Sequence, residues 1–147
     1  MNFKGTVTIR APRERVWHFL TTPEELTECV PGLESLEVIA PNERFRAVAS
    51  VGFGVVKVKF TADAEWMDLD SPNSARMKVH GKAPGSAADA KSEMHLSDGP
   101  DGATVLDWST DVTVMGTIAS LAARLMGTVT QKLTDSFFDC VRVKIES

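Results

Sequence analysis

The residues from about Ser35 to Met115 alternate between apolar and polar side chains, and this pattern constrains the fold more than any other feature of the chain. Such alternation is typical of β-strands that bury one face. Short clusters of turn-forming residues interrupt it at short intervals, so the segment is predicted to be an antiparallel meander. The clusters are Pro41-Asn42, Gly52-Phe53-Gly54, Ser71-Pro72-Asn73, Pro84-Gly85 and Asp98-Gly99-Pro100-Asp101-Gly102.

One more strand and two short helices are predicted before the meander. Phe3 to Arg10 alternates and indicates a half-buried strand. Pro12 suits the first position of a helix. Thr22 is expected to cap a second, shorter helix, in which Glu25 completes a capping box. Pro31-Gly32 ends that helix.

From Thr117 to about Ile145 the apolar residues recur at intervals of three and four, which is typical of an amphipathic helix. At ~1.5 Å per residue this helix is about 40 Å long, enough to cross a sheet of this size. It is the element that can cover the apolar sheet face. We therefore expect one domain over residues 1–147, of the α+β class, with a seven-stranded antiparallel sheet curved around a long C-terminal helix.

Many inward positions of the predicted sheet carry small side chains. A curved sheet around a helix encloses volume unless large side chains fill it, and empty voids are costly. Either the helix packs closely on the small residues, or the space holds a ligand. The small inward residues are Ala47, Ala49, Ala62, Ala64, Ala75, Gly81, Ala88, Ala90 and Ser92.

Strand parity and helix spacing predict which side chains would line such a cavity. Ser92 and Thr110 are the polar members of the set; they either orient a carbonyl or hydroxyl of a bound molecule or bond to the local backbone. The predicted lining residues are Phe45, Ala47, Phe60, Ala62, Trp66, Met77, Val79, Ala90, Ser92, Met94, Trp108, Thr110, Leu121, Leu125, Val129, Leu133 and Phe137.

The turn positions also predict which residues lie opposite each other. Hairpin parity places Arg44 across from Asp63 on the outer face. A turn centred on Pro100 places Trp108 opposite Ser92. Phe53, at a turn tip, is either an exposed aromatic that contacts a membrane or partner, or it folds back over the rim of the sheet.

The charge and the motifs exclude several classes of function. A formal net charge of −4 argues against nucleic-acid binding, which needs a basic stripe. There is no phosphate-binding loop, GxSxG elbow or HExxH motif. No stretch reaches the ~18 apolar residues of a spanning helix, and Met1 to Gly5 does not resemble a signal peptide, so a cytoplasmic location is expected.

The histidines and cysteines predict no catalytic residue, metal site or cofactor. His18 lies on the polar side of the first helix, whereas His80 and His95 face outward, roughly 20 Å apart at ~3.4 Å per residue. Cys29 and Cys140 are interpreted as buried packing residues, because cytoplasmic thiols stay reduced. A disulfide between them is the less favoured alternative.

Several motifs resemble the CoxG family, named for the G subunit of carbon monoxide dehydrogenase, within the START/polyketide-cyclase-like (SRPBCC) superfamily. The likeness covers nearly the whole chain and is most specific in the first 37 residues. The motifs are Phe3-x-Gly5, Ile9-x-Ala11-Pro12-x-Glu14-x-Val16-Trp17-x-Phe19-Leu20, Pro23-Glu24-x-Leu26-x-x-Cys29-Val30-Pro31-Gly32-x-Glu34, Gly54-x-Val56-x-x-x-Phe60, Arg124-Leu125 and Phe137-Phe138.

The resemblance implies a helix-grip fold and a non-catalytic accessory protein of CO dehydrogenase-type molybdenum hydroxylases. Its implied roles are membrane recruitment of the enzyme and carriage of a hydrophobic molecule such as a quinone or lipid, with peripheral contact at the inner membrane face. Ligand access needs a gate, for which the candidates are Cys29, Pro31, Gly32, Phe53 and Gly85.

Two other functions stay open at this point. The same fold supports cyclase- or dehydratase-like enzymes that act on hydrophobic substrates, and fold alone does not decide function. A protein-interaction module, for instance a homodimer formed through an edge strand or the outer sheet face, is the third hypothesis.

Overall fold

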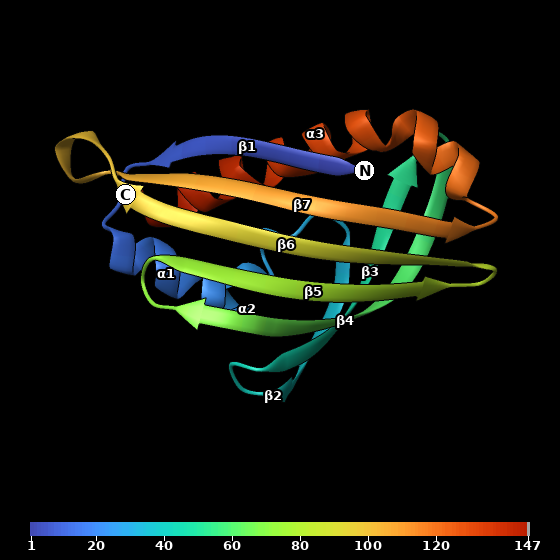
Figure 1. Ribbon diagram of the computed structural model, residues 1–147, viewed down its shortest axis with the longest axis horizontal. Coiled ribbons are helices and arrows are strands. Elements are labelled where there is room, and N and C mark those ends of the chain that lie inside the picture. The colour runs from blue at the N-terminus through green and yellow to red at the C-terminus, as the bar shows by residue number, and fades with distance from the viewer. Residues whose placement is uncertain (147) are drawn as a thin grey trace.

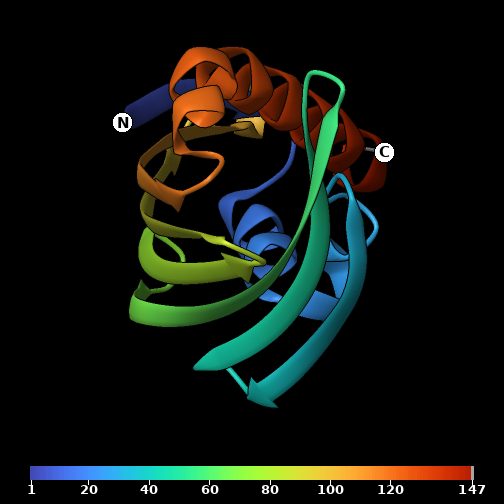
Figure 2. The same cartoon turned by 90° about the vertical axis from the view of Figure 1, so that its right-hand side faces the viewer.

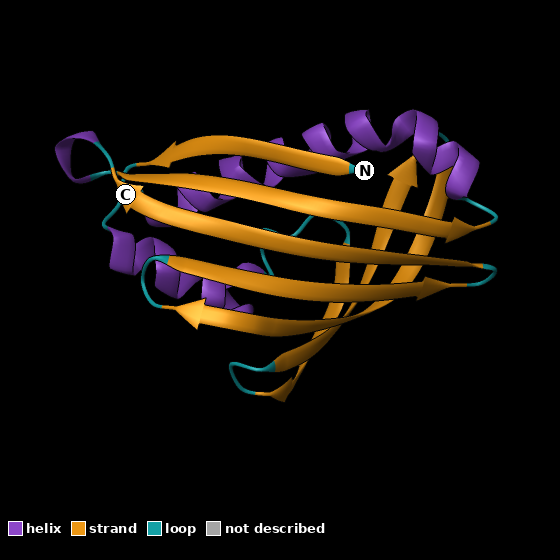
Figure 3. Cartoon of the chain, viewed as in Figure 1, coloured by secondary structure: helices purple, strands orange, loops and turns teal. Residues whose placement is uncertain are grey.

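The computed structural model describes residues 1–146 and consists of one antiparallel sheet, two short helices and one long helix (Figure 1, Figure 3). The seven strands are ordered β1-β7-β6-β5-β4-β3-β2. The elements are β1 (Asn2–Ile9), α1 (Arg13–Thr21), α2 (Pro23–Leu26), β2 (Leu33–Ala40), β3 (Arg44–Phe53), β4 (Val56–Asp70), β5 (Ser74–Ala83), β6 (Ser86–Asp98), a 3₁₀ turn (Pro100–Gly102), β7 (Thr104–Gly116) and α3 (Ala119–Ile145).

The sheet curls into a trough, and α3 lies across its open side (Figure 2). This arrangement follows from the alternation in the strands, because only one sheet face is apolar and needs cover. Helix α3 packs closest against β1, β7 and β3. The predicted α+β fold, with a curved seven-stranded sheet around a long C-terminal helix, is confirmed.

The tightly packed core lies where α1 and the C-terminal end of α3 meet the sheet. Val16, Leu106 and Val141 are fully or almost fully buried there. The hydroxyl of Thr104, also buried, donates a hydrogen bond to the Ala11 carbonyl at 2.7 Å. The dense core thus occupies one end of the molecule, while many inward side chains farther along the trough stay half-buried.

Two predicted pairings are wrong by two residues. Arg44 lies opposite Glu65, and Asp63 instead pairs with Arg46, whose Nε lies 2.8 Å from the carboxylate. The cause is a two-residue turn at Gly54 and Val55, displaced by one position from the predicted centre. Because side chains alternate with a period of two, a shift of two changes the partner and keeps the face.

The same error affects the last hairpin, where Ser92 pairs with Thr110 and Trp108 with Met94. The predicted capping box is also wrong. Thr22 forms no side-chain cap, and the carboxylate of Glu25 instead contacts Arg15 at 3.3 Å and His18 at 3.1 Å. Glu25 thus contacts two side chains of α1 instead of capping the backbone of α2.

Candidate ligand cavity

An apolar cavity of about 500 Å³ lies between the concave face of the sheet, the segment around α2 and the C-terminal half of α3. This volume falls within the ~300–1,000 Å³ of small-molecule sites. Its walls are formed by Leu20, Leu26, Val30, Pro31, Phe45, Ala49, Val51, Trp66, Ala75, Met77, Ser92, Glu93, Met94, Trp108, Ser109, Thr110, Leu133, Thr134, Phe137 and Phe138.

The cavity exists because large side chains frame it while small ones form part of its wall. Trp66, Trp108 and Phe137 border it and stay half-buried, although each faces the interior. The side chains of Ala49 and Ala75, in the same wall, are too short to fill the space that the three aromatic residues border. Of the two alternatives that the small residues left open, close packing and space for a ligand, the structure shows an open apolar space in this part of the trough.

The predicted lining residues divide into two groups. The first borders the cavity and comprises Phe45, Trp66, Met77, Ser92, Met94, Trp108, Thr110, Leu133 and Phe137. The second belongs to the same inner face or to the N-terminal half of α3, yet lies outside the cavity wall. It comprises Ala47, Phe60, Ala62, Val79, Ala90, Leu121, Leu125 and Val129.

The alternation of side chains along a strand cannot separate these groups. It tells which face of the sheet a residue lies on, but not where along the trough the residue lies. The prediction also missed wall residues from the short helices and the segment after them, namely Leu20, Leu26 and Val30. The spacing of four between Leu26 and Val30 was the available signal, since such residues share one side of a helical turn.

The five gate candidates lie in different places. Pro31 borders the cavity, and Cys29 is buried behind it. Gly32 has φ +76°, and a Cβ there would lie 2.1 Å from the Ser50 carbonyl oxygen. Phe53 is only 3% exposed, so it folds back over the rim, and its neighbour Val55 is the exposed residue. Gly85 forms the β5–β6 turn beside Thr117.

The wall includes several hydroxyl side chains, in addition to Trp66, Trp108 and Glu93. Ser92 Oγ and Thr110 Oγ1 lie 2.8 Å apart, and the Thr134 hydroxyl donates to the Thr130 carbonyl. Ser109 donates to Glu93 at 3.3 Å. By the alternation of side chains along β6 and β7, that pair belongs to the outer face of the sheet.

Gly5 lies outside the cavity wall but contacts one of its residues, which the cavity prediction did not anticipate. It pairs directly with Trp108 across β1 and β7, and the indole ring lies over it. A Cβ on Gly5 would lie 2.9 Å from Trp108 Nε1. The signal was present in the sequence, since glycine inside a strand often marks a close approach.

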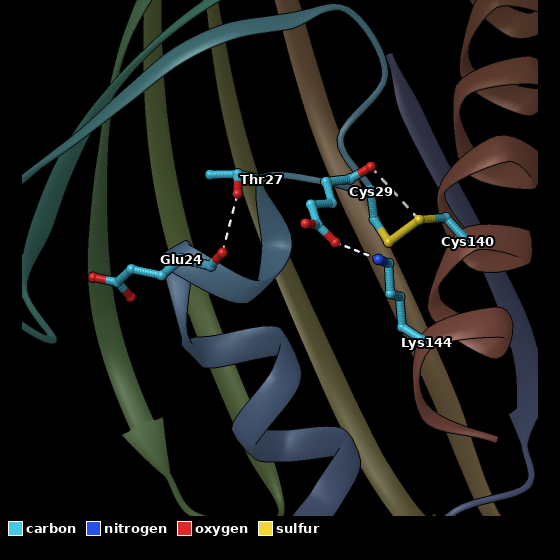
Figure 4. Close-up of a disulfide and its surroundings, with 6 residues drawn as sticks. Glu24, Thr27, Cys29, Cys140 and Lys144 are labelled. Atoms are coloured by element: carbon cyan, nitrogen blue, oxygen red, sulfur yellow. Dashed lines mark hydrogen bonds and ion pairs between the residues drawn. A yellow bond between two sulfur atoms is a disulfide. The ribbon is translucent and has the colours of Figure 1, made fainter. Parts of the chain in front are cut away.

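The interpretation of the cysteines as free packing residues is wrong. Cys29 and Cys140, 111 residues apart in the chain, form a disulfide with a Cα–Cα distance of 5.4 Å (Figure 4). The fold brings the last turns of α3 over the segment that follows α2, which the sequence separation concealed. With this bond formed, cysteine usage no longer argues for a reducing compartment.

An ion pair reinforces the same attachment. Lys144, one helical turn beyond Cys140, pairs with Glu28, the residue before Cys29 (Figure 4). The ammonium group of Lys144 lowers the pKa of the Glu28 carboxyl. The hydrogen bond between them is the larger cause, and charge attraction is the smaller one. The wall segment around Val30 and Pro31 is thus fastened to α3 beside the cavity.

The histidines lie apart from the cavity. His80 pairs with Asp89 on the outer sheet face, and His18 pairs with Glu25. Among residues 1–146, no group of three or more histidine, cysteine or acidic side chains is placed to hold a metal ion. No helix in this range is both long and apolar enough to cross a bilayer.

Solved structures share this architecture. A conserved protein from Geobacillus kaustophilus is 27% identical with a TM-score of 0.90, over 98% of this chain and 94% of that one. A protein from Thermus thermophilus is 23% identical (TM-score 0.66, 95% and 92%). The Zhui aromatase/cyclase from Streptomyces sp. R1128 is 15% identical (TM-score 0.75, 98% and 92%), so the likeness to these last two concerns the fold.

A search among curated proteins found no match. The family model that describes the G subunit of carbon monoxide dehydrogenase (CoxG) matches residues 5–146, nearly the whole chain. The motifs, the helix-grip fold and this match agree, and the chain belongs to the CoxG family.

Proposed function

We propose that this protein is a non-catalytic accessory protein that carries a hydrophobic molecule, such as a quinone or a lipid, in its cavity. The observation that carries the proposal is the apolar cavity of about 500 Å³ with half-buried aromatic walls. Transfer of an apolar guest from water into this space drives binding by ~25 cal/mol per Å² of buried apolar area.

Family membership supplies the proposed partner. A CO dehydrogenase-type molybdenum hydroxylase is the enzyme that a CoxG protein would serve, with the bound molecule or a peripheral membrane contact linking the enzyme to the membrane. Access through the segment around Pro31 is part of this proposal, because Pro31 is the gate candidate that borders the cavity. Co-purification with the hydroxylase polypeptides tests the partner.

A plugging variant tests the carrier function. The protein is incubated with a short-chain ubiquinone or with phosphatidylcholine, and bound mass is measured by native mass spectrometry. Ala49→Trp fills the cavity and is expected to abolish binding while the fold persists. Thr61→Trp, on the exposed outer face of β4, is the matched control and should bind like the wild type. Absence of any bound mass from the wild type contradicts the proposal.

The alternative is a cyclase- or dehydratase-like enzyme acting in the same cavity, and the fold shared with an aromatase/cyclase favours it. Acid–base catalysis needs a titratable group facing the substrate. Within residues 1–146, the polar side chains that line this cavity from the inner face are hydroxyls and tryptophans, which are not acid–base groups, and this favours binding. Recovery of the bound molecule with unchanged mass supports the carrier, whereas a mass change on turnover supports the enzyme.

A further inference from the structure

Two hydroxyl groups face the otherwise apolar cavity side by side. Ser92 on β6 and Thr110 on β7 are direct cross-strand partners, and their oxygens lie 2.8 Å apart. Both border the cavity, together with Met94 and Trp108 from the same strands. We refer to Ser92 and Thr110 as the hydroxyl pair.

The hydroxyl pair has one hydrogen-bond donor to spare. Two hydroxyls carry two O–H groups, and the bond between them uses one. Hydroxyls of this kind often donate to backbone carbonyls, but β6 is paired on both sides, with β5 and with β7, so its carbonyls serve the sheet ladders. Among residues 1–146 neither hydroxyl has a hydrogen-bond partner other than its pair, so the remaining O–H is free to donate to an acceptor within the cavity.

A purely hydrocarbon guest would displace water from this O–H and leave it unpaired, which weakens binding. A guest with a carbonyl oxygen would satisfy it. A carboxylate would bring a charge, and none of the cavity-facing side chains within residues 1–146 is a cation that could neutralise it.

We propose that the hydroxyl pair selects neutral, mostly apolar ligands that carry a carbonyl oxygen. This inference rests on the proposed carrier function and adds a ligand class to it. The carbonyl accepts a hydrogen bond from Ser92 or Thr110, and the ring or chain of the ligand packs against Trp66, Leu133 and Phe137.

The test compares two probes of nearly equal shape, 1-tetralone and tetralin, which differ by one carbonyl group. Binding is measured by calorimetry for the wild type and for the double variant Ser92→Ala/Thr110→Val. The wild type should prefer tetralone by about tenfold, as one hydrogen bond allows. The double variant should lose this preference and still bind tetralin. Each single variant keeps one hydroxyl that can donate, so each should retain most of the preference.

Thr113→Val removes a hydroxyl from the exposed outer face of β7, outside the cavity wall, and should leave the preference unchanged. Laurate is the charged probe and should bind more weakly than tetralone. If both neutral probes bind equally to the wild type, or if the double variant keeps the preference, the hydroxyl pair does not select the ligand although the carrier function stands. If no probe binds to the wild type, both proposals fail.

Discussion

Trp108 takes its position from the glycine opposite it. The indole ring covers Gly5, where even a methyl group would lie 2.9 Å from Nε1. Aromatic side chains commonly shield glycines in this way across paired strands. The ring also forms part of the cavity wall. The lack of a side chain at Gly5 on β1 therefore influences the shape of that wall.

Gly5→Ala should therefore displace Trp108 and destabilise the protein by about 1–3 kcal/mol, the usual cost of overpacking. The wavelength of tryptophan emission and the midpoint of denaturant unfolding report the two effects. Gly127→Ala is the control. A Cβ on Gly127 meets nothing within 4 Å, and alanine is favoured by about 1 kcal/mol within a helix, so this variant should be more stable. Equal stability of the Gly5 variant and the wild type would contradict the tight Gly5–Trp108 contact.

At the scale of secondary-structure elements, the attachment of the post-α2 segment to α3 decides one wall of the cavity. Both the disulfide and the Glu28–Lys144 ion pair join these elements, and Cys140 and Lys144 lie on one side of α3 at a spacing of four. The covalent bond restricts the unfolded chain, and the ion pair is an exposed contact of the folded state.

Replacement of both cysteines by alanine should lower the free energy of unfolding by about 2–5 kcal/mol, since the disulfide joins residues 111 positions apart and closes a long loop. Equilibrium denaturation measures this change. Wild type reduced with a dithiol should match the double variant. Equal stability of the oxidised wild type and the double variant would show that the disulfide contributes nothing.

The ion pair predicts a pH effect of defined sign. The pKa of Glu28 is lowered in the folded protein, so the pair stabilises the fold above the ordinary carboxyl pKa. This stability is lost as the pH falls through the lowered value. An NMR titration should show the pKa of Glu28 returning to its ordinary range in Lys144→Gln, whereas Lys132→Gln should leave it lowered. An unchanged Glu28 pKa in Lys144→Gln would exclude the pair.

At the scale of the whole molecule, packing is divided between a dense end and a hollow part. The dense end, around Val16, Leu106 and Val141, holds the elements together. The hollow part retains half-buried apolar side chains that a guest would cover. A guest that binds only the folded protein must therefore stabilise it.

Addition of short-chain ubiquinone should raise the unfolding temperature in proportion to the logarithm of its concentration. At a concentration 100 times its Kd the gain is about 2.7 kcal/mol. Differential scanning calorimetry measures the shift, and Ala49→Trp, with its cavity filled, should show none. An equal shift in that variant would place binding outside the cavity.

The amino-acid sequence by itself determined the elements and the faces. Periods of two and of three to four residues gave the strands, the long helix and the inward side of each, because local backbone geometry produces these periods. Errors of two residues in strand pairing left the faces intact, as with Arg46 and Asp63. The family motifs lay in the sequence as well, and residues 5–146 match the family model.

Only the tertiary structure decided what meets across the interior. The Cys29–Cys140 bond, the Gly5–Trp108 contact and the extent of the cavity depend on how far the sheet curls and where α3 crosses it. Alternation assigns Ala49 and Ala90 to the same face, yet only Ala49 borders the hollow. The periodicity of the sequence tells only whether a side chain points inward or outward. Its position along the trough depends on how elements that are distant in the chain pack together.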